Sequence, residues 1–190
     1  MSDTPLPLEN FARTICNEAT RISEDALFCY AGHAQEARWW EGVHLWLGIP
    51  TTIIAAITGV TSLSDTSGSS LVFGFNSSVV VGILAFIVAA MSGVSTYLDP
   101  KGQASKHYHA ANAYLALLND IRIFRKIECA RGSNDDKLED SLRKFNAKLN
   151  ELNSQTIIIS TRAKQIGEKL IRAGKYNYQI DKDTQKLLAS

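Results

Sequence analysis

The residues of this 190-residue chain that are best suited to chemistry are a histidine pair and three cysteines. His107 and His109 lie on either side of Tyr108, and imidazole groups are common ligands of zinc. On a helix, residues two positions apart point to different faces, so this pair is poorly placed to bind one metal ion. We therefore interpret the two histidines as packing or hydrogen-bonding groups of a helical interface.

The cysteines give no stronger sign of a reactive site. Cys16, Cys29 and Cys129 are odd in number and lack metal-binding spacing, so we expect reduced, buried thiols in a cytoplasmic compartment. The sequence also lacks a glycine-rich phosphate loop and a nucleophile elbow. We predict that the protein is not an enzyme and uses no cofactor and no metal.

A long uncharged region in the middle of the chain indicates the helices on which the rest of the structure is built. Between Gly42 and Leu98 the chain carries one charged residue, Asp65. The region divides into two uncharged stretches, 43–64 and 71–98, joined by the Ser- and Gly-rich loop 65–70. Each stretch reaches the roughly 20 residues that a helix needs to cross a bilayer. The sequence predicts an all-α membrane protein built on a two-transmembrane helical hairpin, residues 43–98.

Basic and aromatic residues predict the orientation of this hairpin. The loop 65–70 has no Lys or Arg, whereas Arg38, Lys101 and Lys106 follow or precede the outer ends of the spans. The positive-inside rule then places both termini in the cytoplasm. Aromatic side chains, which favour the membrane interface, gather at the same end. These predicted interface anchors are Trp39, Trp40, Trp46 and Tyr97.

The polar ends are predicted to be cytoplasmic helices. Residues 1–42 form an N-terminal segment that is helical over 9–40 and continues toward the first span, with Ile15 and Ile22 on its apolar stripe. Residues 99–190 form the C-terminal segment, with a first helix over 103–131. The 28 uncharged residues of 71–98 would make a helix of about 42 Å, so we expect span two to tilt or to run on into that helix. The core candidates of the helix 103–131 are Tyr114, Leu118, Ile121 and Ile127.

The region 138–173 carries a heptad pattern, which is typical of a coiled coil or a tight helical bundle. Its apolar or small positions follow a 4-3-4-3 spacing: Leu138, Leu142, Phe145, Leu149, Leu152, Thr156, Ile159, Ala163, Ile166, Leu170 and Ala173. A single helix of about 60 Å fits this pattern. A turn near Asn150, Asn153 and Ser154 would give a helical hairpin instead. We favour the long helix, because a break has no reason to preserve the register, and we expect Gly174 to end it.

Small and hydroxyl side chains recur along both predicted spans. The candidates for helix packing or pore lining are Thr51, Ala55, Thr58, Gly59, Ser78, Gly82, Ala85, Ala89 and Gly93. Helices associate in lipid through close approach at such residues. These faces either seal the hairpin to itself or make contacts between subunits. Pro50 lacks a backbone N–H, so we also predict a kink near the cytoplasmic end of span one.

The ordered set of motifs around the spans resembles a known family. The set comprises His33-Ala34 and Trp39-Trp40, Leu47-Gly48-Ile49-Pro50 with Ala56-Ile57-Thr58-Gly59, and after span two Asp99-Pro100, Lys101, His107, Ala110-Ala111, Tyr114, Leu117 and Arg122. Over roughly residues 20–130 it is similar to the SLATT proteins, two-transmembrane effectors associated with nucleotide-second-messenger and SLOG-type sensor systems in bacteria. The resemblance implies a pore-forming or membrane-disrupting effector of antiphage defence in the bacterial inner membrane.

Two functions fit these expectations. In the first, several copies assemble into an oligomeric pore, because two spans cannot enclose an aqueous path alone, and the cytoplasmic helices gate it. The absence of intramembrane Lys, Arg or Glu argues against a proton relay or a charge-selective filter. In the second, the hairpin anchors a coiled-coil scaffold that recruits cytoplasmic partners. The expected partners are the lipid bilayer, further copies of the chain and an upstream signalling protein or nucleotide second messenger, with no nucleic acid.

Overall fold

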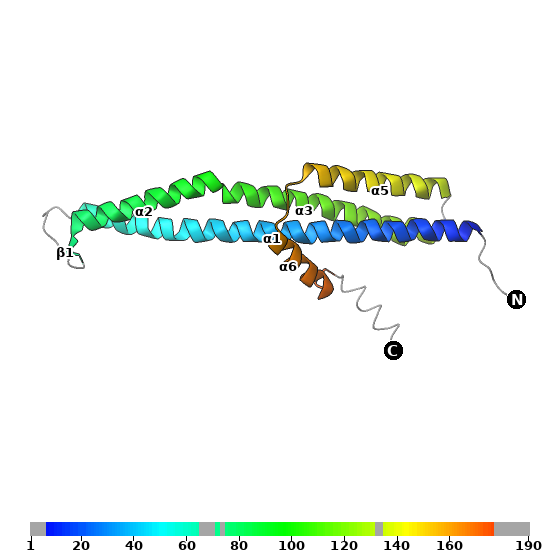
Figure 1. Cartoon of the computed structure of the whole chain (residues 1–190), viewed down its shortest axis with the longest axis horizontal. Helices are drawn as coiled ribbons and strands as arrows, with labels where there is room; N and C mark the ends of the chain where they lie inside the picture. The colour runs from blue at the N-terminus through cyan, green and yellow to red at the C-terminus, as the bar shows by residue number, and fades with distance from the viewer. Residues whose placement is uncertain (1–6, 65–70, 73–74, 132–134, 177–190) are drawn as a thin grey trace. The chain divides into compact units, whose positions relative to one another are not determined.

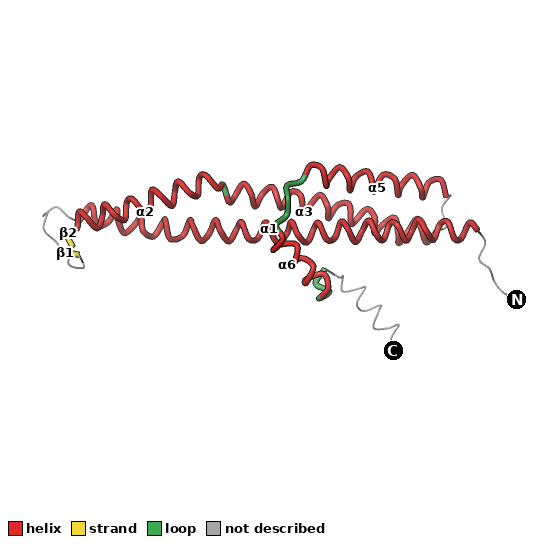
Figure 2. The backbone as a smooth tube through the Cα atoms, viewed as in Figure 1, coloured by secondary structure: helices red, strands yellow, loops and turns green. Residues whose placement is uncertain are grey.

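The computed structural model describes residues 7–64, 71–72, 75–131 and 135–176, and nearly all of them are helical (Figure 2). The chain forms two compact units. We call residues 38–105 the middle unit and residues 1–37 with 106–190 the terminal unit. The helices are α1 (Pro7–Ser64), α2 (Ser77–Leu98), α3 (Pro100–Ile123), the π-helix η1 (Phe124–Glu128), α4 (Cys129–Arg131), α5 (Asp135–Gln155) and α6 (Thr161–Arg172) (Figure 1). The long helix α1 belongs to both units, and it confirms the predicted continuation of the N-terminal helix toward span one.

The core of the terminal unit lies where α1, α3 and α5 pack together. Ile15 and Ile22 of α1 are buried in one cluster with Tyr114 and Ile121 of α3. Leu138 of α5 is buried in the same cluster. Small buried residues of α1 allow the close packing: Ala19, Ala26, Ala31 and Ala37. The fold of this unit therefore rests on an apolar stripe along each helix.

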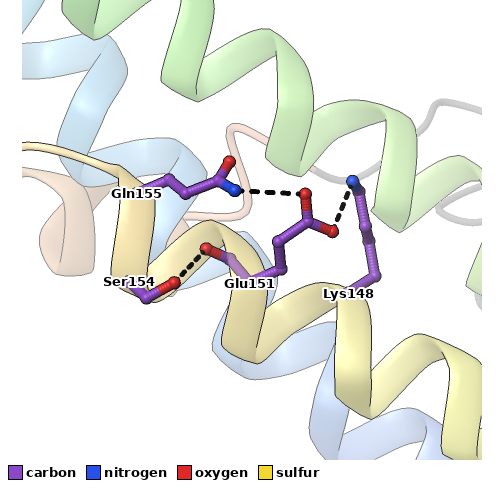
Figure 3. Close-up of polar contacts among 4 residues, drawn as sticks. All are labelled: Lys148, Glu151, Ser154 and Gln155. Carbon is purple, nitrogen blue, oxygen red and sulfur yellow. Dashed lines mark hydrogen bonds and ion pairs between the residues drawn. The ribbon is translucent and has the colours of Figure 1, made fainter.

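The predicted long helix over 138–173 is wrong, because the chain leaves the helix after Gln155 and resumes it at Thr161. The intervening residues include three consecutive isoleucines, and β-branched side chains lower helix propensity. At the end of α5, the Ser154 hydroxyl donates to the Glu151 carbonyl, while Lys148 and Gln155 donate to the Glu151 carboxylate (Figure 3). The hydrogen bond from Lys148 lowers the pKa of that carboxyl.

The second helical segment, α6, crosses α1 instead of returning along α5. A Cβ built on Gly167 would lie 3.1 Å from the backbone of Ala31 and Gly32, so the two helices touch where both have little or no side chain. The side chain of Ile159 packs against Gly32, where an added Cβ would lie 3.0 Å from the Cδ1 atom of Ile159. The predicted stop at Gly174 is confirmed, since this glycine has a φ of 66° just after α6 ends.

The helix predicted over 103–131 exists, but it starts at Pro100 and contains the π-helical turn η1. Tyr114 and Ile121 are buried and Leu118 packs against the core, as predicted. Ile127 is exposed, which corrects its assignment to the core. A π-helical turn inserts one extra residue, so the positions within and after it rotate relative to the α-helical pattern.

In the middle unit, α1 and α2 are two helices long and apolar enough to cross a membrane. Residues 71–76 are not part of the second span, because β1 (Leu71–Val72) pairs antiparallel with β2 (Phe75–Asn76) and α2 starts only at Ser77. The 22 residues of α2 make about 33 Å of helix, close to the bilayer core. The length of α2 alone therefore does not require a tilt. Helix α3 follows α2 after the single residue Asp99, which agrees with the expectation that span two runs on into the next helix. The predicted loop 65–70 lies outside the described residues.

The junction between α2 and α3 is a break of one residue, Asp99, before Pro100. Asp99 has a φ of 42°, and its Oδ1 accepts a hydrogen bond of 3.1 Å from the backbone N–H of Gly102. Asp99 therefore acts as the N-cap of α3, and Pro100 occupies the first helical position. The left-handed backbone of a non-glycine residue is stabilised here by the side chain that caps the next helix.

Candidate functional site

The two spans contact each other through residues at heptad-like spacing. On α1 the half-buried positions include Leu47, Thr51, Ile54 and Thr58. On α2 they are Val80, Val81, Leu84, Val88, Met91 and Ser95. The Thr51 and Thr58 hydroxyls donate to the carbonyls of Leu47 and Ile54, so both polar groups are satisfied within α1. These two predicted site residues lie at the contact between the spans.

The other candidates in the spans are exposed: Ala55, Gly59, Ser78, Gly82, Ala85, Ala89 and Gly93. A Cβ added to Gly59, Gly82 or Gly93 would meet nothing within 4 Å. At 100° per residue, Gly82, Ala89 and Gly93 fall on the side of α2 opposite its half-buried positions. The small faces are therefore not what joins the two spans.

Helix α1 runs through Pro50 without interruption. The hydroxyls of Thr51 and Thr52, the two residues after this proline, donate to the carbonyls of Leu47 and Gly48. The predicted aromatic anchors lie on α1 and α2. Trp39, Trp46 and Tyr97 are exposed, and the rings of Trp39 and Trp40 meet edge to face at 4.7 Å.

The terminal unit contains a buried polar cluster centred on two histidines. The Nδ1 atoms of His33 and His107 lie 3.0 Å apart, and both side chains are almost fully buried. A contact between two ring nitrogens at this distance requires one N–H and one bare nitrogen. Burial lowers the pKa of His33 to about 4, and the neighbouring His107 adds to this effect. Burial also lowers the pKa of His107, against an opposing influence of Glu36.

Glu36 connects this cluster to the start of α6. The carboxylate is buried, and its Oε2 accepts a hydrogen bond of 2.5 Å from the Ser160 hydroxyl and one of 3.4 Å from the Ser160 N–H. The same Ser160 oxygen accepts from the N–H of Ala163, so Ser160 caps α6. A single serine thus joins the start of α6 to the buried Glu36 of α1.

Tyr114 connects the histidines to the end of α5. Its ring stacks on His33 with centroids 5.6 Å apart, and its hydroxyl donates to Asn153 Oδ1 at 2.7 Å. The thiol of Cys29 points to the same Asn153 oxygen at 3.9 Å, and the Thr156 hydroxyl lies 3.3 Å from Tyr114. Burial raises the pKa of both Tyr114 and Cys29. The cluster therefore links the break between α5 and α6 to α1 and α3.

The expected reduced state of the cysteines is wrong for two of the three. Cys16 of α1 and Cys129 of α4 form a disulfide across 113 residues of sequence. Their Cα atoms are 6.3 Å apart, which suits a disulfide. Cys29 is free and half-buried. Sequence spacing carried no sign of this pair, because the two cysteines meet only after α1 and α4 have packed.

His33 and Glu36 are the functional candidates that the residue patterns did not single out. His107 was interpreted as a packing or hydrogen-bonding group, which its contact with His33 confirms, and His109 is exposed on another face. A signal was present, since a histidine and a glutamate one turn apart are unusual on a helix face that is otherwise built of alanine. Their partners, however, are 74 and 124 residues away.

Within the described ranges, no group of three or more His, Cys, Asp or Glu side chains is arranged to hold a metal ion. No protein-family model, curated protein or solved structure matches the chain. The function is therefore argued from the geometry of the spans and of the buried cluster.

Proposed function

We propose that the protein is a regulated, oligomeric pore-forming or membrane-disrupting effector of the bacterial inner membrane, with both termini in the cytoplasm. The proposal extends to bacterial defence through the resemblance of the sequence to the SLATT proteins. Its main support is one structural observation. The small residues of α2 face away from α1, and nothing lies within 4 Å of the Cβ position of Gly82 or Gly93.

An outward face of this kind is suited to contact with another copy. Lipid supplies no hydrophobic drive for helices to associate, so association depends on close packing across small residues. Gly82, Ala89 and Gly93 permit that approach on α2, and Ala55 and Gly59 permit it on α1. Several copies joined through these faces would enclose a path that two spans cannot form alone.

The residues available to line such a path favour weak selectivity. The hydroxyls of Thr52 and Thr96 are exposed on the spans and donate to carbonyls of their own helices. Each hydroxyl still offers lone pairs to a passing ion or water. Among the described residues of 43–98 there is no Lys, Arg, Asp or Glu. We infer a path without a charge filter.

Regulation is proposed to act through the terminal unit. Helix α1 carries His33 and Glu36 of the buried cluster and continues to Ser64 of the first span. An upstream signalling protein or a nucleotide second messenger that bound one arrangement of the cluster better than another would shift the equilibrium of the assembly. It could shift that equilibrium only by its difference in affinity for the two arrangements.

Release of carboxyfluorescein from liposomes that carry the purified protein tests the proposal. Release that rises more steeply than in proportion to protein density supports an oligomeric pore. Release proportional to density contradicts assembly. Vesicles that stay tight at every density favour the second candidate.

That candidate is a membrane-anchored scaffold. It is favoured by the exposed isoleucines between α5 and α6, where Ile158 is 91% exposed and Ile157 is also accessible. Exposed apolar side chains of this kind can bind a partner protein. Exchange of residues 43–98 for an unrelated two-span hairpin distinguishes the two functions. A scaffold keeps its cellular activity after the exchange, whereas a pore loses it.

A further inference from the structure

A cleft opens between the two spans at the end where α1 enters the middle unit and α2 ends at Leu98. Its volume is about 550 Å³, within the range of roughly 300–1,000 Å³ that is usual for ligand pockets. Trp39, Gly42 and Trp46 of α1 form one wall, and Val94 and Leu98 of α2 form the other. The chemistry of this lining indicates what the cleft holds.

The lining combines one cation with apolar side chains. Arg38 is exposed and is the only charged residue among those that line the cleft. Arginine is more weakly hydrated than lysine and binds phosphate oxygens through two parallel N–H groups. Every other lining side chain is aliphatic, aromatic or absent, as at Gly42. The cleft therefore offers a phosphate contact at one position and an apolar surface along the rest.

The tryptophans place this arrangement at the surface of a bilayer. Trp46 is 80% exposed and Trp39 is also exposed. Indole rings favour the headgroup level, where the ring contacts hydrocarbon and the N–H contacts polar groups. A molecule in the cleft would thus have its polar part beside Arg38 and its apolar part between the spans.

We propose that this cleft is a binding site for one anionic phospholipid, with the phosphate on Arg38 and an acyl chain between Trp46 and Leu98. A basic residue beside a groove between membrane helices recognises anionic headgroups in this way. The site depends on α1 and α2 lying in a bilayer and does not depend on pore formation. An anionic lipid is favoured over a zwitterionic one because it brings no cation near the guanidinium.

The fluorescence of the protein reports on this site directly. All three tryptophans of the chain, at positions 39, 40 and 46, lie beside or in the cleft. The full-length protein is reconstituted in phosphatidylcholine vesicles that contain increasing amounts of brominated phosphatidylglycerol, whose acyl bromines quench tryptophan. The parallel series contains brominated phosphatidylcholine. We expect half-maximal quenching at an about fivefold lower mole fraction of the anionic lipid, the ratio that corresponds to ~1 kcal/mol for one basic residue near a membrane surface.

Two pairs of variants separate the cleft from the general surface charge. Arg38→Gln removes the cation and should abolish the preference, whereas Lys101→Gln removes an exposed cation that does not line the cleft and should preserve it. Gly42→Phe fills the cleft and should also abolish the preference. Gly48→Phe is its control, since Gly48 likewise has nothing within 4 Å of an added Cβ but lies outside the cleft.

Four results would overturn the proposal. Equal quenching by the two brominated lipids would show that the cleft does not select an anionic headgroup. An equal loss of preference in the Arg38 and Lys101 variants would assign the preference to surface potential. Competition by soluble glycerol phosphate would show that the cleft takes a free phosphate, and quenching that falls as protein density rises would show that a second copy fills it.

Discussion

The Nδ1 atoms of His33 and His107, on α1 and α3, face each other at 3.0 Å inside the terminal unit. Tyr114 stacks on one of the two rings, and Glu36 influences the other. The pair can share one proton between the two nitrogens, but it cannot hold a hydrogen on both of them. This contact makes the stability of the terminal unit dependent on pH.

The terminal unit should lose stability as the pH falls from about 6.5 toward 4. Burial holds the pKa of His33 at about 4, below the 6.5 of an unfolded histidine, so the unfolded chain binds more protons in this window. The loss attributable to His33 should approach about 3 kcal/mol. Unfolding of the detergent-solubilised protein, followed by circular dichroism between pH 4.5 and 7.5, measures it.

His33→Asn should reduce this pH dependence, because the variant loses one of the two buried imidazoles and keeps only that of His107. His109→Asn is the control, since His109 is exposed on the helix that carries His107. A His33→Asn protein that keeps the slope of the natural chain would show that other groups cause the pH dependence.

Loss of the disulfide by mutation should lower the free energy of unfolding when the variant is compared with the oxidised natural chain, and should have no effect when it is compared with the reduced natural chain. A disulfide typically contributes about 2–4 kcal/mol, mainly by restricting the unfolded chain, and a bridge across 113 residues of sequence lies at the upper end of that range or above it. Cys129→Ser should lower the free energy of unfolding by that amount without reductant and should match the natural chain when both are reduced. Cys29→Ser serves as the control because Cys29 is free. Labelling of unfolded, unreduced protein should find one free thiol, and three free thiols would contradict the bridge.

Ser160→Ala should weaken the attachment of α6. The change deletes the donor to the buried Glu36 carboxylate and the cap of α6 together, and we expect a loss of about 1–3 kcal/mol. Limited proteolysis between residues 156 and 160 should become faster. Thr161→Ala, at the exposed neighbouring position, should change neither quantity.

A double-mutant cycle of Glu36→Ala with Ser160→Ala then isolates the contact from the cap. The two changes should be less than additive, because each removes the same hydrogen bond. Strict additivity would mean that the effect of Ser160 comes from capping alone.

Ala89→Leu and Gly93→Leu should each reduce dye release at least tenfold if α2 makes contacts between copies. Leucine is compatible with lipid, so insertion is preserved while close approach at the small face is blocked. Ala90→Leu is the matched control for Ala89→Leu, since Ala90 is exposed about 100° around the helix from Ala89. Release that survives both changes would remove this face from the assembly.

The sequence predicted those features that depend on the composition of one segment alone. The two uncharged stretches 43–64 and 71–98 predicted two apolar helices, and the structure contains two that are long enough to cross a membrane. The same information did not locate the start of α2 at Ser77, because the residues of β1 and β2 are as uncharged as the span itself. Hydropathy measures the cost of burial in lipid and not the backbone conformation.

The tertiary structure decided which periodic patterns were used. The heptad spacing of 138–173 continues through the three isoleucines, yet α6 leaves the path of α5 because Gly167 fits closely on Ala31 and Ser160 binds Glu36. The histidine pair and the disulfide likewise join residues 74 and 113 positions apart. Such contacts depend on how whole helices pack, and the local periodicity of any one helix does not contain that information.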